Sequence, residues 1–153
     1  MTYRRFAGMI AASTVIMYGL MYLNTWQWSH VHFSETRLYM ALLMGATMAV
    51  VMLGFMWSMY RERAVNLAIV GGAVIVFAGS LWLVRSQATV GDVSYMRAMI
   101  PHHSIAILTS ERANIRDPRV RELADGIIEA QRREIDEMEA LIADLERNPP
   151  KGD

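Results

Sequence analysis

The sequence predicts an all-α protein in which three transmembrane helices precede an antiparallel helical hairpin. Residues 1–84 carry only seven of the 30 charged side chains in this 153-residue chain, so its two parts suit different solvents. Three long apolar segments lie in the first part, and two helix-start signals follow in the polar part. We therefore expect a membrane domain at 1–84, a linker at 85–91, a hairpin domain at 92–147 and a tail at 148–153.

The three apolar segments at 6–23, 38–60 and 64–84 contain no charged residue. Each approaches the length of about 20 helical residues that crosses a hydrocarbon core of about 30 Å. A span in lipid has to satisfy its own backbone hydrogen bonds, which favours helices. No small-residue cleavage site follows the first segment, so we expect a retained helix rather than a removed signal peptide.

Arginines next to these segments predict the orientation of the membrane domain. Arg4 and Arg5 precede the first segment, and Arg61 and Arg63 fill the joint between the second and the third. Because cytoplasmic loops are enriched in Lys and Arg, both places are expected in the cytoplasm. Three crossings then put the N-terminus inside and the hairpin domain outside the cytoplasmic membrane.

The second apolar segment is rich in methionine. Its members are Met40, Met44, Met48, Met52, Met56 and Met59. Steps of four residues drift by about 40° around a helix, so the row Met40–Met56 forms a spiral ridge rather than one face. Packing by a flexible apolar side chain is the favoured interpretation. A conduit for a soft metal ion is the alternative, and the sequence does not decide between them.

Two capping signals define the hairpin. Asp92 is placed to cap a helix that reaches about Ile115. Asp117 and Pro118 form a second start, because an acidic N-cap is followed by proline at the first helical position. That helix is expected to reach about Arg147. Two helices joined by so short a turn fold back as an antiparallel hairpin.

The second hairpin helix carries a packing seam at steps of four and three residues. The seam comprises Val120, Ala124, Ile127, Gln131, Glu134, Met138, Leu141 and Leu145, and it is widened by Leu123, Ile128, Ile135 and Ile142. Burying Gln131 and Glu134 without partners would cost a few kcal/mol each. The facing helix is therefore expected to supply their partners.

Met96, Met99 and His103 lie on one face of that facing helix, with His102 about 100° further round. Folding the hairpin about Asp117 brings this face level with three residues of the seam, Gln131, Glu134 and Met138. Thioether and imidazole groups in a chain without cysteine suit Cu(I), and with more imidazole Cu(II). The alternative is a buried hydrogen-bond network of His103, Gln131 and Glu134, with methionines that only pack.

This pattern resembles the bacterial domain-of-unknown-function 305 family. The residues that carry the resemblance are Asp92, Tyr95, Met99, Ile100, Pro101, His102, His103, Ala106, Ala130, Gln131, Glu134, Ile135 and Met138. The resemblance implies a ferritin-like helical fold, a Gram-negative inner membrane and, through some periplasmic relatives, copper binding. In the metal-binding hypothesis, Met96, Met99, His102, His103 and Met138 are the ligands, with Gln131 and Glu134 as outer partners or occasional ligands.

Larger members of that family repeat the hairpin to make four helices. A single hairpin would leave apolar surface in contact with water. A second chain could complete a four-helix bundle by two-fold symmetry, so we expect a homodimer or packing of the hairpin onto the protein's own membrane part.

The combined expectation is a membrane-anchored periplasmic protein that binds copper, or another soft or borderline ion such as silver, for buffering, tolerance or handover. His30 and His32, in the loop on the same side as the hairpin, are candidate accessory ligands. The alternative is an assembly module that oligomerises without metal. A transporter is disfavoured because the apolar segments hold no charge. An enzyme is not expected without a nucleophile–base set, nor a nucleic-acid partner at a net charge of +0.

Overall fold

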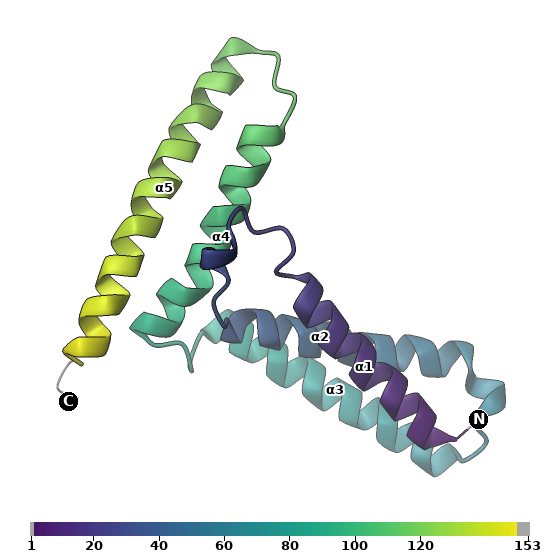
Figure 1. Ribbon diagram of the computed structural model, residues 1–153. Coiled ribbons are helices and arrows are strands. Elements are labelled where there is room, and N and C mark those ends of the chain that lie inside the picture. Colours follow the sequence, from purple (N-terminus) through teal and green to yellow (C-terminus); the bar gives the residue numbers. More distant parts are fainter. Residues whose placement is uncertain (1, 150–153) are drawn as a thin grey trace. The chain divides into compact units, whose positions relative to one another are not determined.

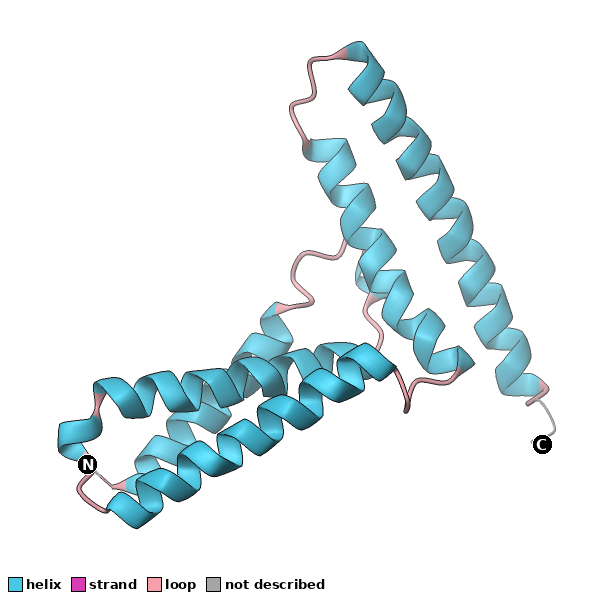
Figure 2. Cartoon of the chain, turned by 180° about the vertical axis from the view of Figure 1, so that it is seen from behind, coloured by secondary structure: helices cyan, strands magenta, loops and turns pink. Residues whose placement is uncertain are grey.

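The computed structural model describes residues 2–149, and in that range it contains only helices and connecting loops (Figure 2). The α-helices are α1 (Tyr3–Leu20), α2 (Glu35–Phe55), α3 (Arg63–Ser86), α4 (Asp92–Arg112) and α5 (Pro118–Arg147), labelled in Figure 1. Two single 3-10 turns, η1 (Trp28–His30) and η2 (Trp57–Met59), lie between them. The all-α prediction is confirmed for this range. Of the expected tail at 148–153, residues 150–153 fall outside the described residues.

The chain divides into two compact units. Unit 1 comprises Met1–Met21 and Glu35–Thr89, and unit 2 comprises Tyr22–Ser34 and Val90–Asp153. The sequence alone assigns the loop Tyr22–Ser34 to the membrane domain at 1–84. Its contacts instead group it with the hairpin.

In unit 1, α2 packs against both α1 and α3. The buried face of α2 consists mostly of small residues, which are Ala41, Gly45, Ala46 and Ala49, followed by Leu53. Gly45 lies directly against Thr14 of α1, because a Cβ atom built on Gly45 would lie 2.3 Å from Thr14 Oγ1. The Thr14 hydroxyl also donates a hydrogen bond to the Ile10 carbonyl at 2.8 Å, which holds it in place. Small side chains thus let α1 and α2 approach closely.

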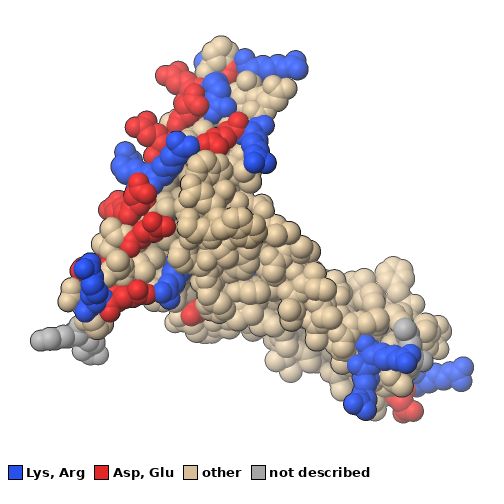
Figure 3. Space-filling model, in the orientation of Figure 1, with Lys and Arg blue, Asp and Glu red and all other residues tan. Residues whose placement is uncertain are grey.

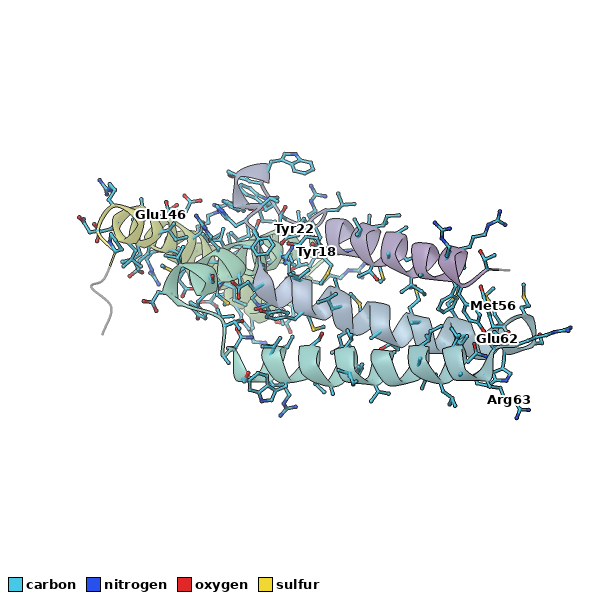
Figure 4. All side chains as sticks on the ribbon, turned by 90° about the horizontal axis from the view of Figure 1, so that it is seen from below. Tyr18, Tyr22, Met56, Glu62, Arg63 and Glu146 are labelled. Atoms are coloured by element: carbon cyan, nitrogen blue, oxygen red, sulfur yellow. The ribbon has the colours of Figure 1, made fainter. Side chains whose placement is uncertain are left out.

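A buried polar contact joins the start of α1 to the α2–α3 connection. The Tyr3 hydroxyl donates to Asn66 Oδ1 at 2.9 Å, and Asn66 Nδ2 donates to the Tyr60 carbonyl at 2.8 Å. Met56, Glu62 and Arg63 lie together at this end of unit 1 (Figure 4). Basic side chains gather there as well, whereas the visible length of the three helices carries few charges (Figure 3).

Two helices, not the expected three, are long and apolar enough to cross a membrane within the described residues. They are Glu35–Phe55 and Arg63–Ser86. The first apolar segment does not qualify as a candidate membrane span, because α1 begins at Tyr3 and Arg4 and Arg5 occupy its first turn. The apolar remainder ends at Leu20 and has about 15 residues, or about 22 Å of helix, which is short of a core of about 30 Å.

In unit 2, α4 and α5 form the hairpin. Asp117 caps α5, since its carboxylate accepts the backbone N–H of Arg119 at 2.9 Å and Pro118 follows as the first helical residue. The buried core between the helices comprises Met96, Ile100, Ile107, Ile135 and Ile142, and Trp26 from the loop Tyr22–Ser34 packs against it.

The packed face of α5 differs from the predicted seam. Val120, Ile127 and Leu141 were expected in the core but are 48%, 38% and 46% exposed. Ile135 and Ile142, which were expected to widen the seam, are in the core and are 2% and 9% exposed. Because α5 carries apolar residues at adjacent positions, such as Leu141 and Ile142, its pattern fits two faces about 100° apart, and contact with α4 selects the second.

Candidate metal centre

One groove along the hairpin brings together most of the predicted ligands. It has a volume of about 680 Å³, and its lining includes Met96, Met99 and His103 from α4 and Met138 from α5. Four carboxylate side chains, those of Asp92, Glu134, Glu137 and Asp144, also line it. The groove therefore combines soft sulfur atoms, one imidazole and a surplus of negative charge.

His103 is held from both ring nitrogens. Its Nδ1 lies 3.0 Å from the Met99 carbonyl, and its Nε2 lies 2.7 Å from Glu134 Oε2. A carbonyl oxygen only accepts, so Nδ1 donates to it. Nε2 and the Glu134 carboxylate then share one proton. Because an imidazole binds a metal through an unprotonated nitrogen, Nε2 becomes a ligand only when this proton leaves and Glu134 gives way.

His102 does not join the groove. It is exposed, and its ring centroid lies 6.2 Å from that of His103. Consecutive residues of a helix point about 100° apart, so a helix that turns His103 toward α5 turns His102 away. The structure thus separates the two histidines that the resemblance treats as one pair of ligands.

The register of the hairpin also differs from the expected one. His103 was placed level with Gln131, but it meets Glu134, and Gln131 reaches that pair only through a 3.4 Å contact from its Nε2 to Glu134 Oε2. The cause is the connection at 113–117, which carries the chain past the end of α4 before α5 begins (Figure 1). His103 therefore faces a residue of α5 further along the chain than folding about Asp117 predicts.

The described residues contain no group of three or more His, Cys, Asp or Glu side chains arranged to hold a metal ion. A soft-metal centre among them would therefore draw on methionine sulfur. This condition fits the groove, because Met96, Met99 and Met138 supply thioethers beside His103. It disfavours zinc, which prefers thiolate, imidazole and carboxylate ligands.

The loop Tyr22–Ser34 is fastened to the hairpin through residues that sequence reasoning missed. The backbone N–H of Trp26 donates to Ser104 Oγ at 2.7 Å, and His30 Nδ1 lies 3.0 Å from the same oxygen. The Trp26 indole N–H donates to Glu111 at 2.8 Å, and the Arg132 guanidinium lies 5.4 Å from the Trp26 ring centroid. The available signal was Ser104 itself, a polar residue at a core position of α4.

The predicted accessory histidines lie away from the methionines. His30 lines a second groove of about 370 Å³, shared with Arg132, Asp136 and Glu139 but with no methionine. His32 Nε2 is buried without a hydrogen-bond partner in the part of the chain that the structure describes. Burial lowers the pKa of His32, and the charges of Arg97 and His30 lower it further, against an opposing effect of Glu139.

Comparisons with known proteins place these features in a family. The profile described as "Domain of unknown function (DUF305)" matches residues 92–153, which include both hairpin helices. An uncharacterized protein of Acanthamoeba polyphaga mimivirus is 34% identical over 140 residues, covering 88% of this chain and 88% of its own. The likeness thus extends into the apolar helices. Since this relative is viral, it does not support the bacterial source that the resemblance implied. No solved structure matches the chain.

Proposed function

Because the chain belongs to the DUF305 family, we propose that it is a membrane-anchored metal-binding protein that buffers or hands over copper. One observation carries the proposal. Three thioethers and one imidazole, from two facing helices, line a single groove of about 680 Å³. In a chain without cysteine, this groove is the strongest soft-ligand candidate among the described residues.

The donor set favours Cu(I) as cargo. Thioether sulfur is a soft neutral ligand and imidazole is a borderline one, which together suit Cu(I) better than zinc or magnesium. We assign Met96, Met99, Met138 and His103 as the ligands. The carboxylates of the same groove raise the local concentration of cations at its mouth.

Three polar residues near the ligands, Glu134, Gln131 and His102, are not assigned as ligands themselves. Glu134 holds His103 in position until the metal arrives, and Gln131 contacts Glu134 from one turn before it. Such outer hydrogen bonds fix ring orientation and tune affinity. His102 stands outside the ligand set, because it is exposed and absent from the groove.

The membrane anchor is provided by α2 and α3, the two candidate spans. Arg61 and Arg63 lie in their connection, and the Tyr3 contact to Asn66 brings Arg4 and Arg5 to the same end of unit 1. An arginine-rich end favours the cytoplasmic side. The hairpin, on the far side of α3 along the chain, then works outside the cytoplasm.

The test is a Cu(I) titration of the full chain in detergent micelles, under reducing conditions and against a chromophoric chelator. Replacing His103 by Gln or Met138 by Leu should weaken binding by about tenfold or more, in the range seen when a ligand or its support is lost. His102→Gln and Met40→Leu are matched controls and should change affinity less than about twofold. Weak binding that none of these four changes alters would refute the proposal.

A second candidate is a metal-free assembly module, which one observation favours. Along α5, Val120, Leu123 and Leu141 are 48%, 65% and 46% exposed, which is a long apolar strip for one helix. A second copy that covers this strip would make a four-helix bundle. If His102→Gln and His103→Gln alter the mass of the complex in multi-angle light scattering while leaving copper content at background, this candidate replaces the first.

A further inference from the structure

The loop Tyr22–Ser34 forms a third element of the hairpin unit, fixed by a buried polar clasp. The clasp consists of the Trp26 backbone, the His30 ring and the Ser104 hydroxyl. Ser104 is 0% exposed and His30 is 8% exposed, so water does not compete for these bonds. Each partner therefore has to be in the right protonation state for the clasp to be satisfied.

The hydrogen bonds at Ser104 indicate which atom of the clasp donates and which accepts. The Trp26 N–H can only donate, so Ser104 Oγ accepts it at 2.7 Å. The Ser104 proton is then directed at His30 Nδ1, 3.0 Å away, which accepts it only when Nδ1 carries no proton. A protonated His30 would turn Nδ1 into a second donor to Ser104 Oγ, so the Ser104 proton would have to find another acceptor.

His32, two residues later, also has to be neutral while the loop is docked. Its Nε2 is buried with no hydrogen-bond partner among the described residues, so a proton added there would find neither water nor an acceptor. The charged groups around it are Arg97 on α4, which repels an imidazolium, and Glu139 on α5, which attracts one. His30, on the loop itself, adds further repulsion.

We propose that Tyr22–Ser34 is an acid-released clasp, docked on α4 and α5 while His32 is neutral and detached when His32 is protonated. Asp136 and Glu139 line the groove beside His30, together with Arg132, and these two carboxylates limit the effect without supplying an acceptor to the buried atoms. The inference does not depend on metal binding, because none of the clasp residues belongs to the methionine groove.

The sign of the effect follows from linkage. The docked state lowers the pKa of His32 below its ordinary value of 6.5, to which it returns when the loop is free. Docking is therefore complete above pH 6.5 and weakens as the pH falls below it. If His32 alone titrates on release, the opening equilibrium rises by up to about 30-fold between pH 7.5 and pH 5.0.

The experiment is hydrogen exchange of the full chain in micelles with a metal chelator present, read at the Trp26 amide, whose N–H makes the clasp bond. Protection factors, corrected for the intrinsic pH dependence of exchange, should fall by more than about twofold from pH 7.5 to pH 5.0. His32→Gln, which stays neutral, should remove most of that fall. His102→Gln, an exposed histidine of the same unit, should leave it as in the wild type.

A second variant covers the case in which His32→Gln disturbs docking at neutral pH. Ser104→Ala removes the shared oxygen, so the Trp26 amide should lose protection already at pH 7.5, and the response to acid should flatten. The proposal is overturned if wild-type protection at Trp26 stays within about twofold between the two pH values. It is equally overturned if His32→Gln and Ser104→Ala both keep the wild-type response.

Discussion

The close approach of α1 and α2 at Gly45 predicts a coupled pair of substitutions. In Gly45→Ala, the new Cβ would lie 2.3 Å from Thr14 Oγ1 and 3.2 Å from Thr14 Cγ2. Carbon atoms in contact prefer about 3.5–4.0 Å, so either Thr14 rotates away or the two helices move apart by about 1 Å. Rotation would also break the 2.8 Å hydrogen bond from Thr14 to the Ile10 carbonyl.

The size of the effect follows from two opposing terms. Overpacking of this kind costs about 1–3 kcal/mol, whereas replacing a helical glycine by alanine gains about 1 kcal/mol. Gly45→Ala should therefore destabilise the protein by up to about 2 kcal/mol. In a Thr14→Ala background the nearest remaining atom of residue 14, Cβ, lies at 3.4 Å, an ordinary contact. There the same change should stabilise by about 0.5–1 kcal/mol.

The assay is reversible unfolding in mixed detergent micelles, followed by circular dichroism for the wild type, both single variants and the double variant. A coupling energy of about 2 kcal/mol is expected, well above the additivity error of about 0.5 kcal/mol. Equal stabilisation by Gly45→Ala in both backgrounds would show that Thr14 does not pack on Gly45. The close packing of α1 on α2 would then be refuted.

Two further predictions concern the hairpin. Ile135→Ala empties a core site that is 2% exposed and should lower the free energy of unfolding by about 2–5 kcal/mol, whereas Ile127→Ala, at a site 38% exposed, should cost less than half as much. Denaturant titration measures both, and equal losses would mean that another surface covers Ile127. At the start of α5, the hydrogen bonds from Arg119 lower the pKa of the Asp117 carboxyl, so its stabilising effect is complete above pH 3.8 and is lost as the pH falls through the lower folded value. Asp117→Asn keeps the cap but should show a smaller fall in Tm between pH 6 and pH 3, and an unchanged fall would contradict this role.

Local signals in the sequence were strong where a single residue decides the structure. Asp117 and Pro118 fix the start of α5, because the carboxylate satisfies a free backbone N–H and proline needs none. The shared groove of Met96 and Met138 follows from counting residues away from the turn. These features depend on helix geometry and chain length, which are visible without knowledge of distant contacts.

The remaining features depend on contacts between distant segments, which a local pattern does not contain. Both Ile127 and Ile135 were expected in the core, and contact with α4 decides that Ile135 is buried while Ile127 stays partly exposed. The pairing of His103 with Glu134 depends on how far the connection at 113–117 carries the chain beyond the end of α4 before α5 begins. The prediction of a third membrane span was wrong because α1 begins before its apolar segment and so carries Arg4 and Arg5 in its first turn.

The position of Tyr22–Ser34 in the chain has a consequence for synthesis. Trp26 bonds to Ser104 and Glu111 across sequence separations of 78 and 85 residues, with α2 and α3 between them. Contacts of such high order form slowly, because the intervening chain has to be placed first. The loop leaves the ribosome early, and its binding surface exists only after α2, α3 and the hairpin helices have been synthesised. The hairpin unit is therefore the last part of the protein to be completed, and the segment at 92–153 shared with the family is not by itself the whole folding unit.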